Sequence, residues 1–325
     1  MNRRPALTAV ALAAAVALLA GCTGANRPAP AATGYPAARP FGVQDPAVIP
    51  STSAGPAQTC NPRASLRLQG ALPAPGQMPA GSTMQKIQQN GLLRVGVDQN
   101  TYLFGYRNPA TGQVEGFDID VVKEVARAIF GDPNKVQLIA ITSAQRIPYV
   151  QQKKVDIVAD TMTINCSRLQ QVDFSSVYYE AGQRLLVSRS SKAASLDDMG
   201  GKKVCAAAGS TSIANIAGYK SKPIPVSVLD WTDCVVLLQQ GQVDGISTDD
   251  TILAGMAEQD PNLQLVGPKF TQEPYGMAMS KDAADFVRFV NGVLDQMRLD
   301  GRLAAINAKW LKANAPPVPK AEYQD

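Results

Sequence analysis

Runs of β-branched and aliphatic residues alternate with amphipathic segments from about residue 84 onward. The runs have the length of buried strands, and the segments between them repeat apolar residues at helical spacing. Strands are predicted at 92–97, 135–141, 155–159, 184–188, 201–208, 226–229, 243–247 and 263–266, with a return of the chain at 275–279. Helices are predicted at 84–89, 116–129, 145–153, 232–240, 283–298 and 303–313, and another begins at Thr251. Asp118 and Asp120 open one of these helices, where we expect them to cap it. Repeated βα units of this kind predict an α/β fold with two similar lobes.

The predicted strand at 155–159 leads directly into polar side chains. Thr161 and Thr163 follow it, and Arg168 comes within reach of the same strand end. In an open α/β sheet, the carboxyl ends of the strands face the crevice in which ligands bind. An arginine fork can grip a carboxylate there through two parallel hydrogen bonds. We therefore interpret 155–168 as a binding site for a small carboxylate; a surface ion pair is the alternative role for Arg168.

Polar groups also follow two strands in the second half of the chain. Ser210 and Thr211 occupy a strand-to-helix turn, whose backbone N–H groups would form a nest for an anion. Asp249 and Asp250 follow the strand at 243–247. One of these acids could cap the helix that begins next to them. We expect the other, Asp249, to meet a cation.

Arg146 opens the predicted helix at 145–153, where its charge opposes the helix macrodipole. A second acidic group on the ligand would account for it, and a solvent-facing arginine is the alternative. Together the groups are complementary to a zwitterion: Arg168 and the nest would hold a carboxylate, while Asp249 and the Thr161 carbonyl would hold an ammonium. Because the groups lie in separate lobes, a ligand would favour the conformer in which the lobes are closed.

Composition limits the chemistry. The 325 residues have room for two domains, and the net charge of +4 falls to about +2 without Arg3 and Arg4, so nothing supports nucleic-acid binding. The sequence has no histidine, which removes His-based triads and the commonest metal ligand. Nucleophile-elbow, phosphate-loop, dinucleotide and zinc-protease motifs do not occur. We expect no catalytic residue, no cofactor and no metal site.

Residues 1–21 have the pattern of a lipoprotein signal peptide. Positive residues precede an apolar stretch at 7–20, which is too short for an ordinary membrane span. Leu19-Ala-Gly-Cys22 resembles a bacterial lipobox, in which the cysteine is diacylated with fatty acids such as palmitate. Lipidation at Cys22 would tether the chain to the outer face of the cytoplasmic membrane. Ordinary signal cleavage nearby and an uncleaved anchor are the alternatives.

Residues 22–83 form a Pro/Ala-rich segment with 11 of the 23 prolines. Its first part should be a disordered spacer, because it cannot bury enough apolar surface to offset its ordering entropy. Four further cysteines remain: Cys60, Cys166, Cys205 and Cys234. In an exported protein this even number suggests two disulfides, with three possible connectivities. If Cys60 pairs with Cys166, the second part of the segment is tied to the globular body.

Several motifs occur in order between residues 82 and 311. They are Gly116-Phe-Asp-Ile-Asp120, Val155-Asp-Ile-Val158, Thr161-Met-Thr163, Arg168, Val172-Asp-Phe-Ser-Ser-Val-Tyr-Tyr179, Gly209-Ser-Thr211 and Thr248-Asp-Asp-Thr251. In this order they resemble the polar amino-acid-binding proteins of bacterial ABC importers, solute-binding protein family 3. The chain is most similar to lipoprotein members of that family in actinobacteria that bind glutamate or glutamine.

The resemblance implies a bilobal type II periplasmic-binding-protein fold with the ligand cleft between the lobes. One lobe would comprise 84–181 and 276–325, and the other 182–275, with crossovers near 180–184 and 273–276. In the family, the counterparts of Arg168, the Thr163 hydroxyl and the Thr211 N–H hold the α-carboxylate of the amino acid. The counterparts of Asp249 and the Thr161 carbonyl hold its α-ammonium.

The resemblance also bears on the ligand's side chain. Thr142-Ser-Ala-Gln-Arg-Ile-Pro148 reproduces a motif of acidic-amino-acid binders, in which the residues matching Ser143 and Arg146 hold the side-chain carboxylate. Two departures lower the positive charge: Asp98 begins a loop in which some relatives have an arginine, and Trp231 replaces a histidine. An aromatic residue that glutamine binders stack near Ser143 is missing here. We expect glutamate or aspartate over glutamine or asparagine; the amides stay open. Asp98, Tyr102, Ser210 and Trp231 are further candidate contacts.

We expect the disulfides Cys205–Cys234 and Cys60–Cys166; a similar Val-Cys…Cys pattern in relatives supports the first. The predicted function is that of a lipid-anchored, monomeric binding protein that captures a polar amino acid outside the cell and delivers it to an ABC permease of the inner membrane. A lipoprotein that senses the ligand and signals to a transmembrane receptor is one alternative. A structural lipoprotein of the cell wall and an amino-acid-processing enzyme on the same fold are the others.

Overall fold

The computed structural model describes residues 38–49, 60–312 and 315–325. The predicted signal peptide at 1–21 and the lipidation site at Cys22 lie outside these residues. Within the described ranges, no helix is both long enough and apolar enough to span a membrane.

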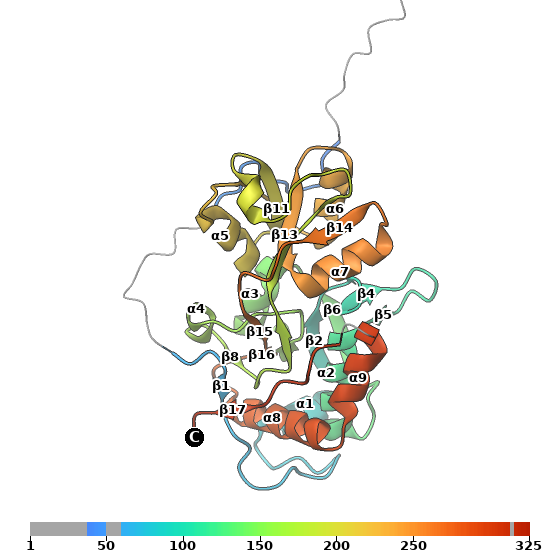
Figure 1. Ribbon diagram of the computed structural model, residues 1–325. Helices are drawn as coiled ribbons and strands as arrows, with labels where there is room; N and C mark the ends of the chain where they lie inside the picture. The colour runs from blue at the N-terminus through green and yellow to red at the C-terminus, as the bar shows by residue number, and fades with distance from the viewer. Residues whose placement is uncertain (1–37, 50–59, 313–314) are drawn as a thin grey trace, which may run out of the picture. The chain divides into compact units, whose positions relative to one another are not determined.

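The first lobe is built on a mixed five-stranded sheet with the order β6-β2-β7-β16-β8. β2 runs parallel to β6 and β7, and β16 runs antiparallel to β7 and β8. The strands are β2 (Leu93–Val97), β6 (Val136–Ala140), β7 (Ile157–Val158), β8 (Asp173–Phe174) and β16 (Ala278–Met279). The helices are α1 (Thr83–Asn90), α2 (Phe117–Phe130), α3 (Arg146–Gln151), α4 (Cys166–Leu169), α8 (Ala284–Leu299) and α9 (Arg302–Leu311). In Figure 1 the C-terminal helices α8 and α9, drawn in red, lie beside α2.

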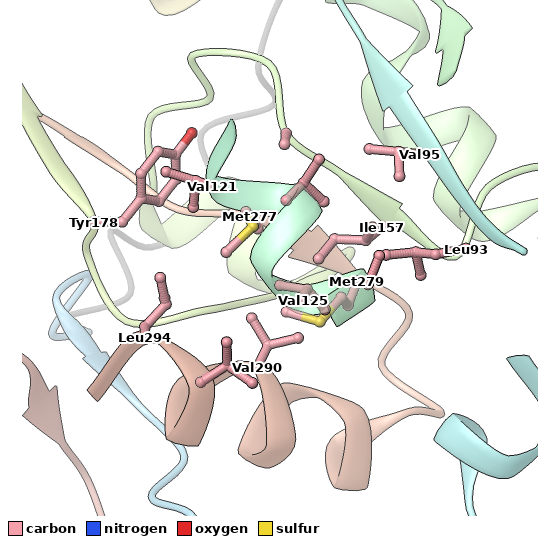
Figure 2. Close-up of a cluster of buried hydrophobic side chains, with 14 of the residues drawn as sticks. Leu93, Val95, Val121, Val125, Ile157, Tyr178, Met277, Met279, Val290 and Leu294 are labelled. Carbon is pink, nitrogen blue, oxygen red and sulfur yellow. The ribbon is translucent and has the colours of Figure 1, made fainter. Parts of the chain in front are cut away.

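The sheet of the first lobe packs against α2 and α8 through one hydrophobic core. Figure 2 shows side chains of β2, α2, β7 and α8 pointing toward one another, together with Met277 and Met279. Val121 and Val125 lie one helical turn apart on the inner side of α2, and both are fully buried. This core fixes the carboxyl ends of β2 and β7, from which the loops of the candidate site extend.

The second lobe has its own sheet, with the order β12-β11-β13-β10-β14. β11 runs parallel to β12 and β13, whereas β10 runs antiparallel to β13 and β14. The strands are β10 (Gln183–Ser188), β11 (Lys203–Ala207), β12 (Ile224–Val228), β13 (Gly245–Asp249) and β14 (Leu263–Val266). The helices are α5 (Thr211–Gly218), α6 (Trp231–Gln239) and α7 (Asp250–Gln259). A separate cluster of buried apolar side chains forms the core of this lobe.

The chain passes between the lobes twice. The first passage runs through β9 (Tyr179–Ala181) and the second through β15 (Glu273–Tyr275), and the two strands pair antiparallel. Each lobe thus has its own sheet and core, and a pair of strands joins them. The predicted α/β fold with two lobes is confirmed.

Residues 38–49 do not behave as the predicted spacer. The N–H of Gln44 donates to the carbonyl of Ser227, at 2.9 Å, and the N–H of Ser227 donates back to the carbonyl of Gln44, at 3.0 Å. Asp45 also pairs with Lys203 at 2.7 Å. The prediction is wrong for these residues because β12 is an edge strand, whose free backbone groups accept a pairing segment.

Both expected disulfides are present. Cys60–Cys166 ties the arm that precedes the first lobe to the start of α4. This arm continues into β1 (Ala64–Ser65), which pairs with the C-terminal β17 (Glu322–Tyr323). Cys205–Cys234 joins β11 to α6 in the core of the second lobe.

The capping role predicted for Asp118 and Asp120 is wrong. Gly116 occupies the N-cap position of α2, and no side chain of the described residues caps this helix end. Asp118 turns inward and accepts hydrogen bonds from the first lobe, and Asp120 accepts from Lys309 and Trp310 of α9. Both acids lie in the first helical turn, but long-range partners compete successfully for their oxygens.

Candidate ligand-binding site

The two lobes are in direct contact with each other. The guanidinium Nη2 of Arg168, in the first lobe, donates to the carbonyl of Gly209, in the second, at 3.3 Å. A Cβ atom at Gly209 would lie 2.7 Å from the Cα of Ala144, and its φ of +76° also favours glycine. Gly255 of α7 packs as closely on Tyr102, because a Cβ there would lie 2.6 Å from the Tyr102 carbonyl oxygen. Backbone thus meets backbone across the interface.

All the charged side chains that are buried among the described residues gather at this interface. They are Asp98, Asp118, Arg146, Asp160 and Arg168 in the first lobe, Asp249 in the second, and Glu273 in β15. Each of them perturbs the pKa of at least one other. Buried charges are costly unless they are paired, and they concentrate where proteins bind or react. This cluster is therefore the candidate site.

Arg168 lies at the centre of the cluster. It belongs to α4, a helix that the sequence did not predict, whose N-cap Asn165 accepts the backbone N–H of Arg168 at 2.9 Å. Its Nη1 donates to the carbonyl of Thr163 at 2.6 Å. Burial, together with the charge of Arg146, lowers the pKa of Arg168 to about 9, although Glu273 counteracts this shift. A ligand carboxylate would supply the compensating charge that this buried guanidinium needs.

One carboxylate joins the two threonines expected at the α-carboxylate. Thr163 donates its hydroxyl to Oε2 of Glu273 at 2.6 Å, and Thr211 donates its hydroxyl to the same oxygen at 3.0 Å. The threonines belong to different lobes, and Glu273 belongs to the crossover strand. The sequence did not indicate this residue. In this arrangement Glu273 takes the Thr163 hydroxyl, which a ligand carboxylate is also expected to use.

Thr161 has a left-handed backbone conformation, with φ of +41°. Its N–H donates to Oδ2 of Asp118 at 2.8 Å, and Tyr178 donates its hydroxyl to the other oxygen of Asp118 at 2.7 Å. Burial raises the pKa of Asp118 to about 6. Asp118 therefore holds the turn whose carbonyl we expect to receive the ligand's ammonium.

Asp249 ends β13 and faces the crossover strand. Its Oδ2 accepts the hydroxyl of Tyr275 at 2.6 Å, but its buried Oδ1 has no hydrogen-bond partner among the described residues. Burial, and after it the charge of Glu273, raises the pKa of Asp249 to about 8. An ammonium group would satisfy the open oxygen and stabilise the ionised form.

Arg146 and Ser143 lie together at the start of α3, as their motif led us to expect. Arg146 donates from Nε to the Ser143 carbonyl at 3.0 Å and from Nη1 to the Asp160 carbonyl at 2.9 Å. The carboxyl of Asp160 is 4.0 Å from Nε of Arg146, and neither of its oxygens has a hydrogen-bond partner within the described ranges. Backbone carbonyls thus orient the guanidinium beside an unsatisfied carboxyl.

The four further candidates differ in what they offer a ligand. Asp98 accepts from the Asn100 N–H and the Thr101 hydroxyl, so both of its oxygens are engaged. Ser210 caps α5 and its hydroxyl is likewise engaged.

Trp231, the first residue of α6, has a buried indole N–H without a partner in the described part of the chain. Tyr102 meets the second lobe through its backbone.

A cavity of about 380 Å³ opens beside the cluster, and Thr163, Thr211 and Glu273 are among the residues that line it. Arg63 of the N-terminal arm also lines it and forms an ion pair with Glu180 of β9. The Cys60–Cys166 bridge keeps this arm beside the site.

A family model for bacterial extracellular solute-binding proteins, family 3, matches residues 93–313. The chain belongs to this family. The glutamine-binding protein GlnH of an ABC transporter in Bacillus subtilis is 43% identical to this family-3 chain, over 71% of the chain and 85% of that protein. A glutamate/aspartate import solute-binding protein of Salmonella typhimurium is 28% identical, over 73% of the chain and 82% of that protein. Among solved structures, a solute receptor for L-cysteine from Neisseria gonorrhoeae has a TM-score of 0.68 and 26% identity, and the match covers 71% of this chain and 94% of that one.

Membership in solute-binding protein family 3 was expected from the motifs and is confirmed. The members of this family are extracytoplasmic binding proteins and not enzymes, in agreement with the expectation from the sequence. The roles assigned to single residues stay predictions, although the structure brings Arg146, Arg168 and Asp249 into one charged cluster.

Sequence reasoning about this family-3 site missed Asp118, Asp160, Glu273 and Tyr275. Asp160 directly precedes Thr161, but nothing in the sequence tells that its carboxyl is buried and unpaired.

A larger cavity, of about 730 Å³, lies elsewhere, between α7 and the end of α9, and Trp310 and Leu265 help to line it. In the described part of the chain, none of the buried charged side chains lines that cavity, so the charged cluster remains the candidate site.

Proposed function

We propose that this family-3 protein captures a polar α-amino acid outside the cytoplasmic membrane and delivers it to an ABC permease. The observation that carries the proposal is the buried pair of opposite charges from different lobes, Arg168 and Asp249. Each has an unmet electrostatic or hydrogen-bonding need that the zwitterionic part of an amino acid would satisfy. The names of the relatives support the same class, because they bind glutamine, glutamate or aspartate.

In the proposed complex, the α-carboxylate binds Arg168 with the help of the Thr163 hydroxyl and the Thr211 N–H. The ammonium binds Asp249 and the carbonyl of Thr161. Arg168 already reaches the second lobe through Gly209, so a ligand between the two charges would add contacts only in the closed arrangement. Differential contact of this kind shifts the conformer population toward closure.

The side chain of the ligand is read by Ser143 and Arg146 in this proposal. The guanidinium of Arg146 favours a carboxylate, hence glutamate or aspartate. The adjacent carboxyl of Asp160 adds an acceptor that suits the N–H₂ of glutamine or asparagine, and a glutamine-binding relative at 43% identity favours this second candidate. The proposal is therefore a binder of short acidic or amide amino acids, with the acidic ones preferred through Arg146.

We also propose that Cys22 carries the lipid anchor, that residues 22–83 connect it to the lobes, and that the lobes are bounded as 84–181 with 276–325 and 182–275. Delivery to a permease and signalling to a transmembrane sensor would both use the closed lobes.

Metabolic labelling with palmitate tests the anchor: the label should enter the native chain and not the Cys22→Ala variant. An equally labelled variant would show that the lipid is elsewhere.

Calorimetry on the purified mature chain tests the ligand. Glutamate, aspartate, glutamine and asparagine should each bind, and Arg146→Ala should weaken the two acids by about 100-fold, the effect of losing a charge-assisted hydrogen bond, but the two amides by less than about tenfold. Arg127→Ala, on the exposed side of α2, is the matched control and should leave the affinity for all four amino acids unchanged. Absence of binding to all four amino acids would refute the proposal, and equal losses for all four would show that Arg146 does not read the side chain.

A further inference from the structure

Asp160 differs from the other buried acids of the site. Its side chain is 1% exposed, and neither carboxyl oxygen has a hydrogen-bond partner among the described residues. Asp98 and Asp118, by contrast, each use both oxygens. A buried carboxyl without partners loses its hydration and gains nothing in return. It therefore needs a donor from outside the chain, or a proton of its own.

Arg146 is close to Asp160 but does not satisfy it. The nearest separation between the charged groups is 4.0 Å, from Nε to Oδ2, which is too long for a hydrogen bond. Nε donates instead to the carbonyl of Ser143, and Nη1 donates to the backbone carbonyl of Asp160. The backbone thus holds the guanidinium in place, and a carboxyl that can both donate and accept lies beside it.

The charged neighbours of Asp160 come from several elements. Arg146 of α3 and Arg168 of α4 favour its ionised form, whereas Asp98 after β2 and Asp118 of α2 disfavour it. Burial is the largest influence and raises the pKa of Asp160 well above its usual range. Tyr178, which donates its hydroxyl to Asp118, is a further titratable group that interacts with Asp160. The protonated carboxyl thus persists to higher pH than in a free aspartate.

On the basis of the proposed function, we infer that Asp160 is a specificity-determining residue that sets the choice between a carboxylate and a carboxamide on the ligand. A side-chain carboxylate that binds Arg146 has acceptors only, so it requires the protonated Asp160, which donates its O–H. A carboxamide places its oxygen toward Arg146 and its N–H₂ toward the ionised Asp160, which accepts. One pocket then takes both ligand classes, and the proton on Asp160 selects between them.

The competing role for Asp160 is to hold the ligand's ammonium. Asp249 is the better partner for that group, because its unpartnered Oδ1 lies in the opposite lobe from Arg168. The two roles differ in their consequences. An ammonium contact would affect every amino acid equally, whereas a side-chain contact changes the ratio between acid and amide.

The test is calorimetry with glutamate and glutamine at pH 5.5 and pH 8.5, on the native chain and on Asp160→Asn. Free glutamate keeps its side chain ionised at both pH values, and titration of Asp249 affects both ligands alike, so the affinity ratio isolates the side-chain pocket. In the native chain the glutamate-to-glutamine affinity ratio should fall between pH 5.5 and pH 8.5, by up to about tenfold for each pH unit above the pKa of Asp160. In Asp160→Asn the amide N–H₂ replaces the carboxyl O–H as a donor, so the ratio should favour glutamate and no longer depend on pH. Asp282→Asn, whose side chain is exposed, should behave as the native chain.

A ratio in Asp160→Asn that matches the native ratio at both pH values would overturn the inference, as would an equal loss of affinity for both ligands. Should Asp160→Asn fail to fold, the measurements on the native chain decide the question. A glutamate-to-glutamine affinity ratio that is constant with pH overturns the inference, and a ratio that falls as the pH rises supports it. Failure of the proposed function itself is distinct, since in that case the native chain binds neither amino acid.

Discussion

The two lobes contribute to the candidate site very differently. Among the described residues, the first lobe supplies five of the buried charged side chains, and the second lobe supplies only Asp249. The first lobe also holds its charges through side-chain and backbone hydrogen bonds that exist without the second, as between Arg146 and Ser143 or between Asp118 and Thr161. In the proposed complex, the first lobe would therefore be a preorganised half-site that the second lobe completes. Preorganisation of this kind reduces the ordering that binding requires.

Arg168→Ala, which removes the central charge of the first lobe's half of the site, should have the largest effect on ligand affinity. We expect at least about a 1,000-fold loss of affinity for every amino acid, because two or more charge-assisted hydrogen bonds disappear and a neighbouring carboxylate loses its counter-charge. Calorimetry measures the loss, with Arg127→Ala as the control. An affinity within tenfold of the native value would remove Arg168 from the carboxylate site.

Asp249→Asn should weaken binding by about 100-fold for all ligands, because an ammonium loses a charged acceptor. Asp250→Asn is the matched control, since the adjacent acid bonds to Gly182 and Lys269 outside the cluster. It should retain affinity within threefold. Equal losses in both variants would point to damage to α7 and not to a lost contact.

The same aspartate should make binding pH-dependent. The pKa of Asp249 is about 8 in the folded chain, against roughly 3.9 when unfolded. Ammonium binding favours the ionised form, so uptake of an amino acid should release a proton and the affinity should rise from pH 6 to pH 8. The stability of the ligand-free protein should change in the opposite direction to the affinity. Between pH 4 and 8 the Asp249 carboxyl ionises in the unfolded chain but stays protonated in the folded one, so the free energy of unfolding should fall as the pH rises through that window. Calorimetry in buffers of different ionisation enthalpy measures the proton release, and Asp249→Asn should abolish its share.

Glu273 lies between the lobes, and its substitution should raise ligand affinity instead of lowering it. Glu273→Gln should weaken the hydrogen bond that Glu273 accepts from the Thr163 hydroxyl and make this hydroxyl available to a ligand carboxylate. We expect affinity to rise by about fivefold, or roughly 1 kcal/mol, which is the typical net contribution of one hydrogen bond, and the melting temperature of the ligand-free protein to fall by a few degrees. Weaker binding would instead show that Glu273 orients the threonines for the ligand.

The smallest effect on affinity should follow removal of the bridge on the first lobe. In the double variant Cys60→Ser with Cys166→Ser, affinity should stay within threefold, because α4 keeps its Asn165 cap and Arg168 its backbone contacts. The free energy of unfolding should nevertheless fall by about 2–4 kcal/mol, since the bridge closes a long loop. Denaturation with urea measures this change. The double variant Cys205→Ser with Cys234→Ser is the comparison on the second lobe, where the bridge is fully buried in the core.

Hydrophobic periodicity determined most of the longer elements and the two-lobed α/β class, because buried strands and amphipathic helices have different repeats that a sequence shows directly. The strand at 263–266 has its predicted bounds, and α8 begins and ends within a residue of its prediction. The site residues Arg146, Arg168 and Asp249 could be proposed because each follows or opens a predicted element, where side chains reach a crevice.

Tertiary structure alone decided how the polar groups are paired. The sequence predicted that Asp118 caps a helix, but its carboxylate instead accepts a hydrogen bond from the backbone N–H of Thr161, in a turn far away in the sequence. Residues 38–49 looked like a spacer, and an edge strand of the second lobe bound them. Glu273 carried no local signal. Asp160 follows the predicted strand at 155–159, but its sequence position does not tell whether its carboxyl is satisfied, since that depends on which segments meet around it. Local sequence determines what a side chain can donate or accept, and only the fold determines what remains for a ligand.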